Sequence, residues 1–195
     1  MIKTTFVGKN YSGWGCLSVL AEEVQRLGAK KALLITDPFL RRNGMADNIA
    51  ARLKDIGVDS VIYDEVAAEP PLALAQSLVD FTRAQAADLV IGLGGGSALD
   101  LAKLAAVFAE QEGEVREYLN LSGSKSLSTR GLPKIMIPTT SGTGSEITNI
   151  SVLSLESTKD VIAHDFLLAD VAIVDPELTV SVPPRVTAPT GIDAL

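Results

Sequence analysis

Short apolar runs alternate with amphipathic stretches through the first two-thirds of the chain. The apolar runs predict buried strands at residues 31–36, 60–63, 88–93 and 134–137. Between them, apolar residues recur at helical spacing and predict helices at residues 17–27, 47–56, 72–85 and 97–111. Strands that are apolar on both faces and are separated by helices favour a parallel sheet that is covered on both sides. The pattern therefore predicts an α/β fold with a Rossmann-like parallel sheet and helices on both faces.

The pattern changes after Thr148. Two short strands, at residues 150–155 and 161–163, are joined by a turn and predict an antiparallel hairpin laid onto the parallel fold. Residues 171–174 predict one further strand, and Pro183-Pro184 begins a new segment.

Composition and charge narrow the class of protein. Of the 195 residues, 47% are hydrophobic and 21% are charged, as in ordinary soluble globular proteins. The net charge of −7 excludes the basic stripe that nucleic-acid binding normally requires. No apolar run approaches the roughly 20 residues that span a bilayer, and residues 1–5 open no signal-peptide pattern. The only cysteine, Cys16, lies in an apolar stretch, and we expect it to pack there. Because a single cysteine can form no disulfide within the chain, we expect a cytoplasmic protein.

A glycine-rich loop follows the predicted strand at residues 88–93. Gly94-Gly95-Gly96 leads directly into a helix, and bare backbone N–H groups at a helix N-terminus can approach a diphosphate closely. Ser97 can cap this helix and also offer its hydroxyl to a phosphate. The loop is neither the common dinucleotide fingerprint nor a Walker loop. Taken alone, it also fits a tight strand-to-helix turn that binds nothing.

A second polar loop follows the strand at residues 134–137. Residues 138–146 read Pro-Thr-Thr-Ser-Gly-Thr-Gly-Ser-Glu and are dense in hydrogen-bond donors. An ordinary Ser/Thr-rich turn has a similar composition. However, both loops lie at the carboxyl ends of parallel strands, where α/β folds bind their ligands, and this favours a binding site.

Four motifs carry a resemblance to a known family. They are Gly94-Gly95-Gly96-Ser97-x-x-Asp100-x-x-Lys103, Pro138-Thr139-Thr140-x-Gly142-Thr143-Gly144-Ser145-Glu146, Val174-Asp175-Pro176-Glu177-Leu178 and Thr190-Gly191-Ile192-Asp193-Ala194-Leu195. In sequence, order and spacing they resemble the iron-dependent alcohol dehydrogenase family, which includes lactaldehyde reductase and 1,3-propanediol dehydrogenase. The likeness extends over essentially the whole chain.

The resemblance implies a division of the chain and a function. Members of this family have an N-terminal α/β domain that binds NAD(P), an all-helical domain, and a divalent metal between them. Residues 1–182 would then be the dinucleotide-binding domain, and residues 183–195 the start of a helical domain that is otherwise absent. The implied reaction is hydride transfer between NAD and a small primary alcohol or diol, or its aldehyde. Family members are often homo-oligomers.

The resemblance also implies the residues that bind the cofactor. Asp37 matches the position beside the adenosine ribose, where a carboxylate repels a 2′-phosphate and so favours NAD over NADP. Taken alone, an aspartate before Pro38 is more often a turn residue. The other implied cofactor-binding residues are Gly95, Gly96, Ser97, Thr139, Thr140, Thr143, Val152 and Lys159.

Asp193 matches a metal ligand. In the family this aspartate binds the divalent ion, Fe²⁺ or Zn²⁺, together with three histidines farther along the chain. Taken alone, an aspartate two residues after a glycine is normally a helix-capping residue. The only histidine here, His164, matches no ligand, and we expect it to be structural or exposed.

The sequence departs from the family pattern in three places and leaves two alternatives open. Glu69-Pro70-Pro71 replaces a motif that often ends in threonine, Pro189 replaces a small residue, and residues 11–15 are irregular. One alternative is a metal-free reductase of the same superfamily, similar to maleylacetate reductase, although such relatives change the residues that correspond to Asp100 and to the second loop. The other is a non-catalytic NAD-binding module.

Overall fold

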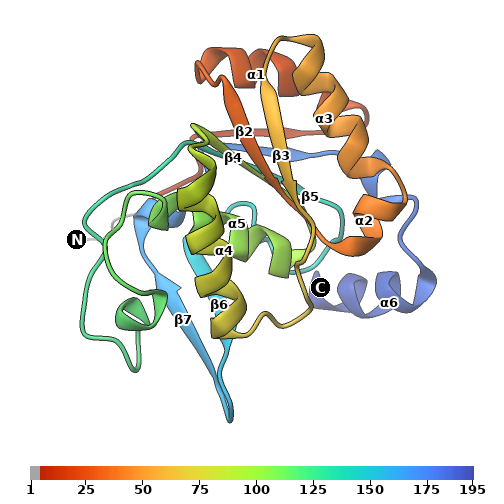
Figure 1. Cartoon of the computed structure of the whole chain (residues 1–195). Coiled ribbons are helices and arrows are strands. Elements are labelled where there is room, and N and C mark those ends of the chain that lie inside the picture. Colours follow the sequence, from red (N-terminus) through yellow and green to blue (C-terminus); the bar gives the residue numbers. More distant parts are fainter. Residues whose placement is uncertain (1–4) are drawn as a thin grey trace.

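A six-stranded parallel sheet forms the centre of the computed structural model, which describes residues 5–195 (Figure 1). Residues 1–4, part of the segment that shows no signal-peptide pattern, lie outside the described residues. The strand order is β1-β8-β5-β4-β2-β3, and every neighbouring pair is parallel. The strands are β1 (Lys9–Ser12), β2 (Lys31–Ile35), β3 (Asp59–Tyr63), β4 (Leu89–Gly94), β5 (Lys134–Pro138) and β8 (Val171–Val174).

Helices cover both faces of this sheet, which explains why its central strands are apolar throughout (Figure 1). α4 (Leu72–Gln85) and α5 (Gly96–Phe108) pack on the face that presents Leu33, Val90 and Met136. α1 (Leu20–Arg26) and α3 (Met45–Asp55) pack on the opposite face. The remaining helices are α2 (Pro38–Arg42), α6 (Pro184–Asp193) and the 3-10 helices η1 (Cys16–Val19), η2 (Val115–Tyr118), η3 (Asp165–Leu167) and η4 (Pro176–Thr179).

The predicted hairpin forms a separate two-stranded sheet. β6 (Ile150–Ser154) pairs antiparallel with β7 (Lys159–Ala163), and Val152 lies opposite Val161. Leu153 and Ile162 point inward and join the core around α5, so the hairpin packs on the same side of the sheet as α4 and α5. The predicted fold class, a Rossmann-like parallel sheet with an added antiparallel hairpin, is confirmed.

The chain reverses its direction of travel across the sheet between β2 and β4. From β2 it moves outward to β3, and after α4 it returns to β4 and continues toward β5 on the other side. In open α/β sheets, ligands bind at the carboxyl ends of the strands where the strand order reverses in this way. The loops that carry Asp37 and Gly94–Gly96 follow β2 and β4.

The structure differs from the sequence prediction at the ends of several elements and contains elements that were not predicted. β1 and α2 were not predicted, and residues 16–19 form a 3-10 turn before α1. α5 begins at Gly96 and ends at Phe108, rather than extending from residue 97 to 111. In the part of the chain that the structure describes, no helix is long and apolar enough to cross a membrane.

Candidate functional site

Strand register brings three polar loops to one level. Ile35 of β2 lies opposite Gly92 of β4, so Asp37 and Gly94 follow at the same height. Gly94 in turn lies opposite Pro138 of β5, which places Thr139 and Thr140 beside Gly95 and Gly96. The backbone N–H of Thr139 donates a hydrogen bond of 3.0 Å to the carbonyl of Gly94, which ties the first loop to the second.

The glycine loop leaves no room for side chains. Gly94 has φ +149°, and a methyl group placed on it would lie 2.8 Å from Cβ of Ala98. A methyl group on Gly95 would lie 3.2 Å from Oγ1 of Thr140, and one on Gly96 would lie 2.8 Å from Cγ2 of Thr143. The bare backbone therefore faces the threonine side chains of the second loop. This is a narrow cradle at the N-terminus of a helix, the kind of site that holds a diphosphate.

Ser97 follows the glycines directly. The prediction that its side chain caps the helix is wrong. The N-cap residue of α5 is Gly95, and no side chain bonds the first turn. Ser97 is the second residue of the helix itself and is half-buried. Gly95 can be the N-cap because the carbonyl of this residue already accepts the backbone N–H groups of Ala98 and Leu99. The Ser97 hydroxyl therefore has no capping role.

Asp37 caps a helix and also faces the glycine loop. Oδ1 of Asp37 accepts hydrogen bonds from the backbone N–H groups of Phe39 (2.7 Å) and Leu40 (3.0 Å), which begins α2. Oδ2 lies on the side of Gly94, 3.7 Å from the place of a methyl group on that residue. The residue is thus a helix cap rather than a simple turn residue, and its second oxygen lies on the side of the glycine loop.

Val152 and Lys159 lie on the hairpin. The backbone N–H of Val152 donates to Oδ2 of Asp100 at 3.0 Å, so this position is tied to α5, and its side chain is exposed. Lys159 forms an exposed ion pair of 2.8 Å with Glu69, a residue with φ +49°. Among the described residues, the structure therefore brings Val152 to the helix that follows the glycine loop, whereas it pairs Lys159 with Glu69.

Asp193 lies at the end of α6 and next to the second loop. A methyl group on Gly142 would lie 2.7 Å from Oδ2 of Asp193 and 2.9 Å from the carbonyl of Thr190. The Asp193 side chain is exposed. Within residues 5–195, no three side chains of His, Cys, Asp or Glu lie close enough together to hold a metal ion. The described residues thus offer one carboxylate and do not by themselves form a metal site.

His164 has the structural role that we expected. It is the N-cap of η3, where Nδ1 accepts the backbone N–H of Phe166 at 3.1 Å, and its ring packs against the ring of Phe166.

Sequence reasoning missed a buried polar cluster beneath the two loops. Asp100 and Lys103 belong to the glycine-loop motif, but the motif alone assigned no role to either side chain. In the structure they form an ion pair of 3.0 Å, with the side chain of Lys103 fully buried. Burial lowers the pKa of Lys103, and the carboxylate of Asp100 opposes that shift. Two charges in an otherwise apolar helix were the available signal.

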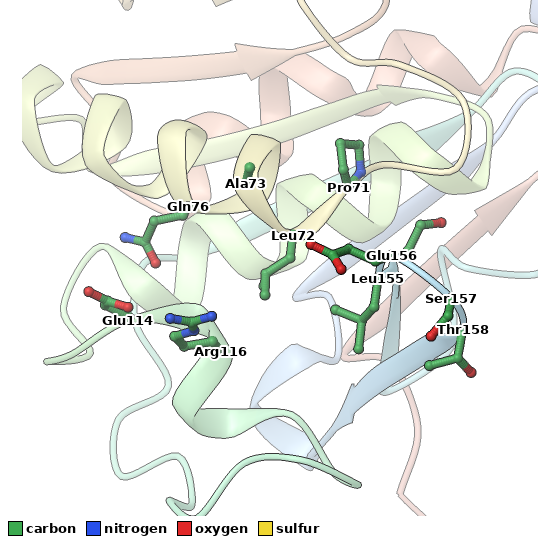
Figure 2. Close-up of a pocket in the computed structure, with 11 residues that line it drawn as sticks. Pro71, Leu72, Ala73, Gln76, Glu114, Arg116, Leu155, Glu156, Ser157 and Thr158 are labelled. Atoms are coloured by element: carbon green, nitrogen blue, oxygen red, sulfur yellow. The ribbon is translucent and has the colours of Figure 1, made fainter.

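A cavity of about 700 Å³ lies elsewhere, between the start of α4, η2 and the turn of the hairpin (Figure 2). Figure 2 shows Leu72 near the middle of the pocket, with Glu114 and Arg116 at one side and Leu155 and Thr158 at the other. Its lining includes no residue of the glycine loop or the second loop, so it is not the cradle described above.

The fold and the paired loops define an α/β protein with a glycine loop at the switch point of its sheet. Residues 8–176 match the family model of the iron-containing alcohol dehydrogenases. Long-chain-alcohol dehydrogenase 1 of Geobacillus thermodenitrificans is 61% identical over 193 residues, which cover 99% of this chain and 49% of that protein. The chain belongs to the iron-containing alcohol dehydrogenase family.

Solved structures agree with this membership. The crystal structure of a 1,3-propanediol oxidoreductase superposes with a TM-score of 0.90 at 33% identity, covering 99% of this chain and 50% of that one. A sulfoacetaldehyde reductase from Bifidobacterium kashiwanohense, solved in complex with NAD⁺, superposes with a TM-score of 0.88 at 31% identity, covering 99% and 51%. The chain therefore spans about half the length of the relatives that it matches.

Proposed function

We propose that this chain is the cofactor-binding part of an NAD-dependent, metal-dependent oxidoreductase that interconverts a primary alcohol or diol and its aldehyde. The observation that carries the proposal is the cradle of Gly94–Gly96 at the N-terminus of α5, with Asp37 on one side and Thr140 and Thr143 on the other. Bare backbone N–H groups at a helix N-terminus favour the binding of a diphosphate. A relative with the same fold binds NAD⁺, which supports this assignment.

Each residue of the site has a role in this proposal. Oδ2 of Asp37 accepts hydrogen bonds from the adenosine ribose and disfavours a 2′-phosphate. The backbone of Gly95 and Gly96, with the Ser97 hydroxyl, holds the diphosphate, since the partial positive charge at the helix N-terminus favours an anion. Further contacts come from the second loop and the hairpin, through Thr139, Thr140, Thr143, Val152 and Lys159.

The reaction site then lies toward Asp193. When NAD is bound, its nicotinamide supplies the hydride chemistry. Asp193 is adjacent to Gly142 in the middle of the second loop, and we assign its carboxylate as one ligand of a divalent metal, Fe²⁺ or Zn²⁺. The remaining ligands would come from a helical domain, to which residues 183–195 belong, while residues 1–182 form the dinucleotide-binding domain. The proposed setting is a cytoplasmic homo-oligomer.

Substitution of Ser97 tests the cradle. Ser97→Asp places a carboxylate where the diphosphate would lie, so NADH affinity measured by calorimetry should fall by about tenfold or more. The matched control is Ser126→Asp, which adds the same charge to an exposed loop and should leave NADH binding unchanged. If Ser97→Asp binds NADH as the wild-type chain does, the cradle is not the diphosphate site.

A further inference from the structure

Asp100 and Lys103 form a buried ion pair, and both side chains also make hydrogen bonds to other segments of the chain. Nζ of Lys103 lies 3.0 Å from Oδ1 of Asp100, in a helix whose other buried residues are almost all apolar. The Lys103 side chain is fully buried, and that of Asp100 is 12% exposed. The pair lies in α5, one and two turns after the glycine loop.

The pair holds the second loop. Nζ of Lys103 donates to the carbonyl of Ser145 at 3.0 Å and to Oγ1 of Thr148 at 3.3 Å. In return, the hydroxyl of Ser145 donates to Oδ1 of Asp100 at 2.5 Å. The loop that faces the glycines through Thr140 and Thr143 is therefore anchored at its far end to the helix that the glycines begin.

The same pair holds the hairpin. Nζ of Lys103 also donates to the carbonyl of Ile150, and Oδ2 of Asp100 accepts the backbone N–H of Val152 at 3.0 Å. The hydroxyl of Ser151 donates to the backbone carbonyl of Asp100 at 3.1 Å. Three consecutive residues of β6 are thus bonded to α5 around these two charges.

Stability alone does not account for a buried ion pair. Two charges lose most of their hydration when they are buried, and well-packed apolar residues of similar volume are often as stable or more stable. A charged pair adds conformational specificity, because all of its hydrogen bonds form in only one arrangement of the loop and the strand. Here these bonds join the helix that begins at the glycine loop to the second loop and to β6.

We propose that Asp100 and Lys103 are positioning residues that hold the second loop and strand β6 in register with the glycine loop. They touch no cofactor atom themselves. They fix the surface against which the nicotinamide end of the dinucleotide lies, while Asp37 and the glycine loop hold the ADP part. This inference rests on the proposed function.

A comparison of two ligands separates the two ends of the site. NADH uses the whole site, whereas ADP lacks the nicotinamide half and is held chiefly by Asp37 and the backbone N–H groups of the glycine loop. For Asp100→Asn/Lys103→Met, which removes both charges at similar volume, we expect NADH affinity to fall about tenfold or more and ADP affinity to change less than about threefold. Lys103→Met and Ser145→Ala should shift the NADH-to-ADP affinity ratio in the same direction.

The control is a second buried lysine, Lys134, whose Nζ donates to the carbonyls of Arg130 and Leu132 at 3.4 Å, away from the second loop and β6. Lys134→Met should leave the ratio unchanged. Circular dichroism reports folding, and if Lys103→Met unfolds because Asp100 loses its partner, the double variant and Ser145→Ala decide the question. A wild-type chain that binds no NADH contradicts the proposed function. Wild-type binding with equal losses of NADH and ADP in the folded variants, or no loss, overturns the positioning role.

Discussion

At Gly96 the missing side chain decides what can lie between the two loops. The place of a methyl group there is 2.8 Å from Cγ2 and 2.9 Å from Oγ1 of Thr143, so a side chain would displace this threonine or fill the cradle. The backbone conformation itself is helical and needs no glycine. The restriction at this position is therefore one of space, and a substitution tests the cradle without straining the backbone.

We expect Gly96→Ala to weaken NADH binding about tenfold while leaving the chain folded. Gly191→Ala is a matched control, because it also lies in a helix but has no atom within 4 Å of the added methyl group. Calorimetric titration with NADH compares the two variants. Equal affinities in Gly96→Ala and Gly191→Ala would show that the space beside Thr143 is not used by the cofactor.

Asp37 combines a structural and a proposed selective role, and two substitutions separate them. Removing the carboxylate should narrow the preference for NADH over NADPH by about 1–3 kcal/mol, because a 2′-phosphate would no longer meet a negative charge. Asp37→Gly also loses the cap of α2, whereas Asp37→Asn removes the charge and keeps a capping side chain. Both variants should therefore narrow the preference in fluorescence titrations with the two cofactors. A wild-type chain that prefers NADPH, or an unchanged ratio in both variants, would remove Asp37 as the discriminator.

At the scale of elements, periodicity predicted most of the sheet and missed the elements that are short or polar. β4 and β5 are buried at every position and, apart from Lys134, read as apolar runs. β1 is a four-residue edge strand with alternating exposure, which offers too few apolar positions to be recognised. α2 has five residues. Taken alone, an aspartate before Pro38 is more often a turn residue, but here it is the N-cap that begins a helix with proline in its first turn.

The candidate site was predictable where it depends on chain order and less so where it depends on side-chain contacts. Motif order placed Asp37, the glycine loop and the second loop at strand ends, and the register brings them to one level. The network of Asp100 and Lys103 joins residues up to 52 positions apart, and no local pattern shows such partners. The Lys159–Glu69 pair depends in the same way on tertiary packing.

A second charged network ties β1 to α1 and makes stability depend on pH. Glu23 is buried, and burial alone raises its pKa, but hydrogen bonds from Lys9, Tyr11 and Arg26 outweigh this and lower the pKa from 4.5 to about 2. A carboxylate whose pKa is lower in the folded state stabilises that state above its unfolded pKa. This contribution is lost as the pH falls from about 4.5 toward 2.

Glu23→Gln should therefore lower the free energy of unfolding by about 2 kcal/mol at neutral pH, because it weakens hydrogen bonds to charged groups. The difference in the free energy of unfolding between wild type and variant should shrink as the pH is lowered through this window. Urea unfolding at several pH values measures this difference. Glu22→Gln, at an exposed position in the same helix, should show little gap at any pH. A Glu23→Gln gap that stays constant with pH would contradict the assignment.

At the scale of the whole molecule, α6 is the least supported element. None of its residues is buried, and Pro189 lies inside it, where proline removes a backbone hydrogen bond. A ten-residue helix without a buried face is marginal in water. Asp193 lies at the end of this helix, so its place beside Gly142 depends on a segment that little else holds.

We therefore expect the 195-residue chain to bind NADH but to have no alcohol dehydrogenase activity, whereas a protein that continues through the helical half of the family should be active. The reason is the number of ligands: a catalytic metal site has about three protein ligands, and the described residues bring only Asp193 to the second loop. An exposed carboxylate can neither exclude water nor orient an alcohol.

The test is an NAD-linked assay with added Fe²⁺ or Zn²⁺ and a panel of small primary alcohols and diols. The 195-residue chain, the longer protein and its Asp193→Ala variant are compared, with NADH binding measured in each. Metal-dependent turnover by the 195-residue chain would refute the two-domain site, and full activity of the long Asp193→Ala variant would remove Asp193 from the metal. If the long protein binds NADH but is inactive on every substrate, the alternative of a non-catalytic binding module is favoured instead.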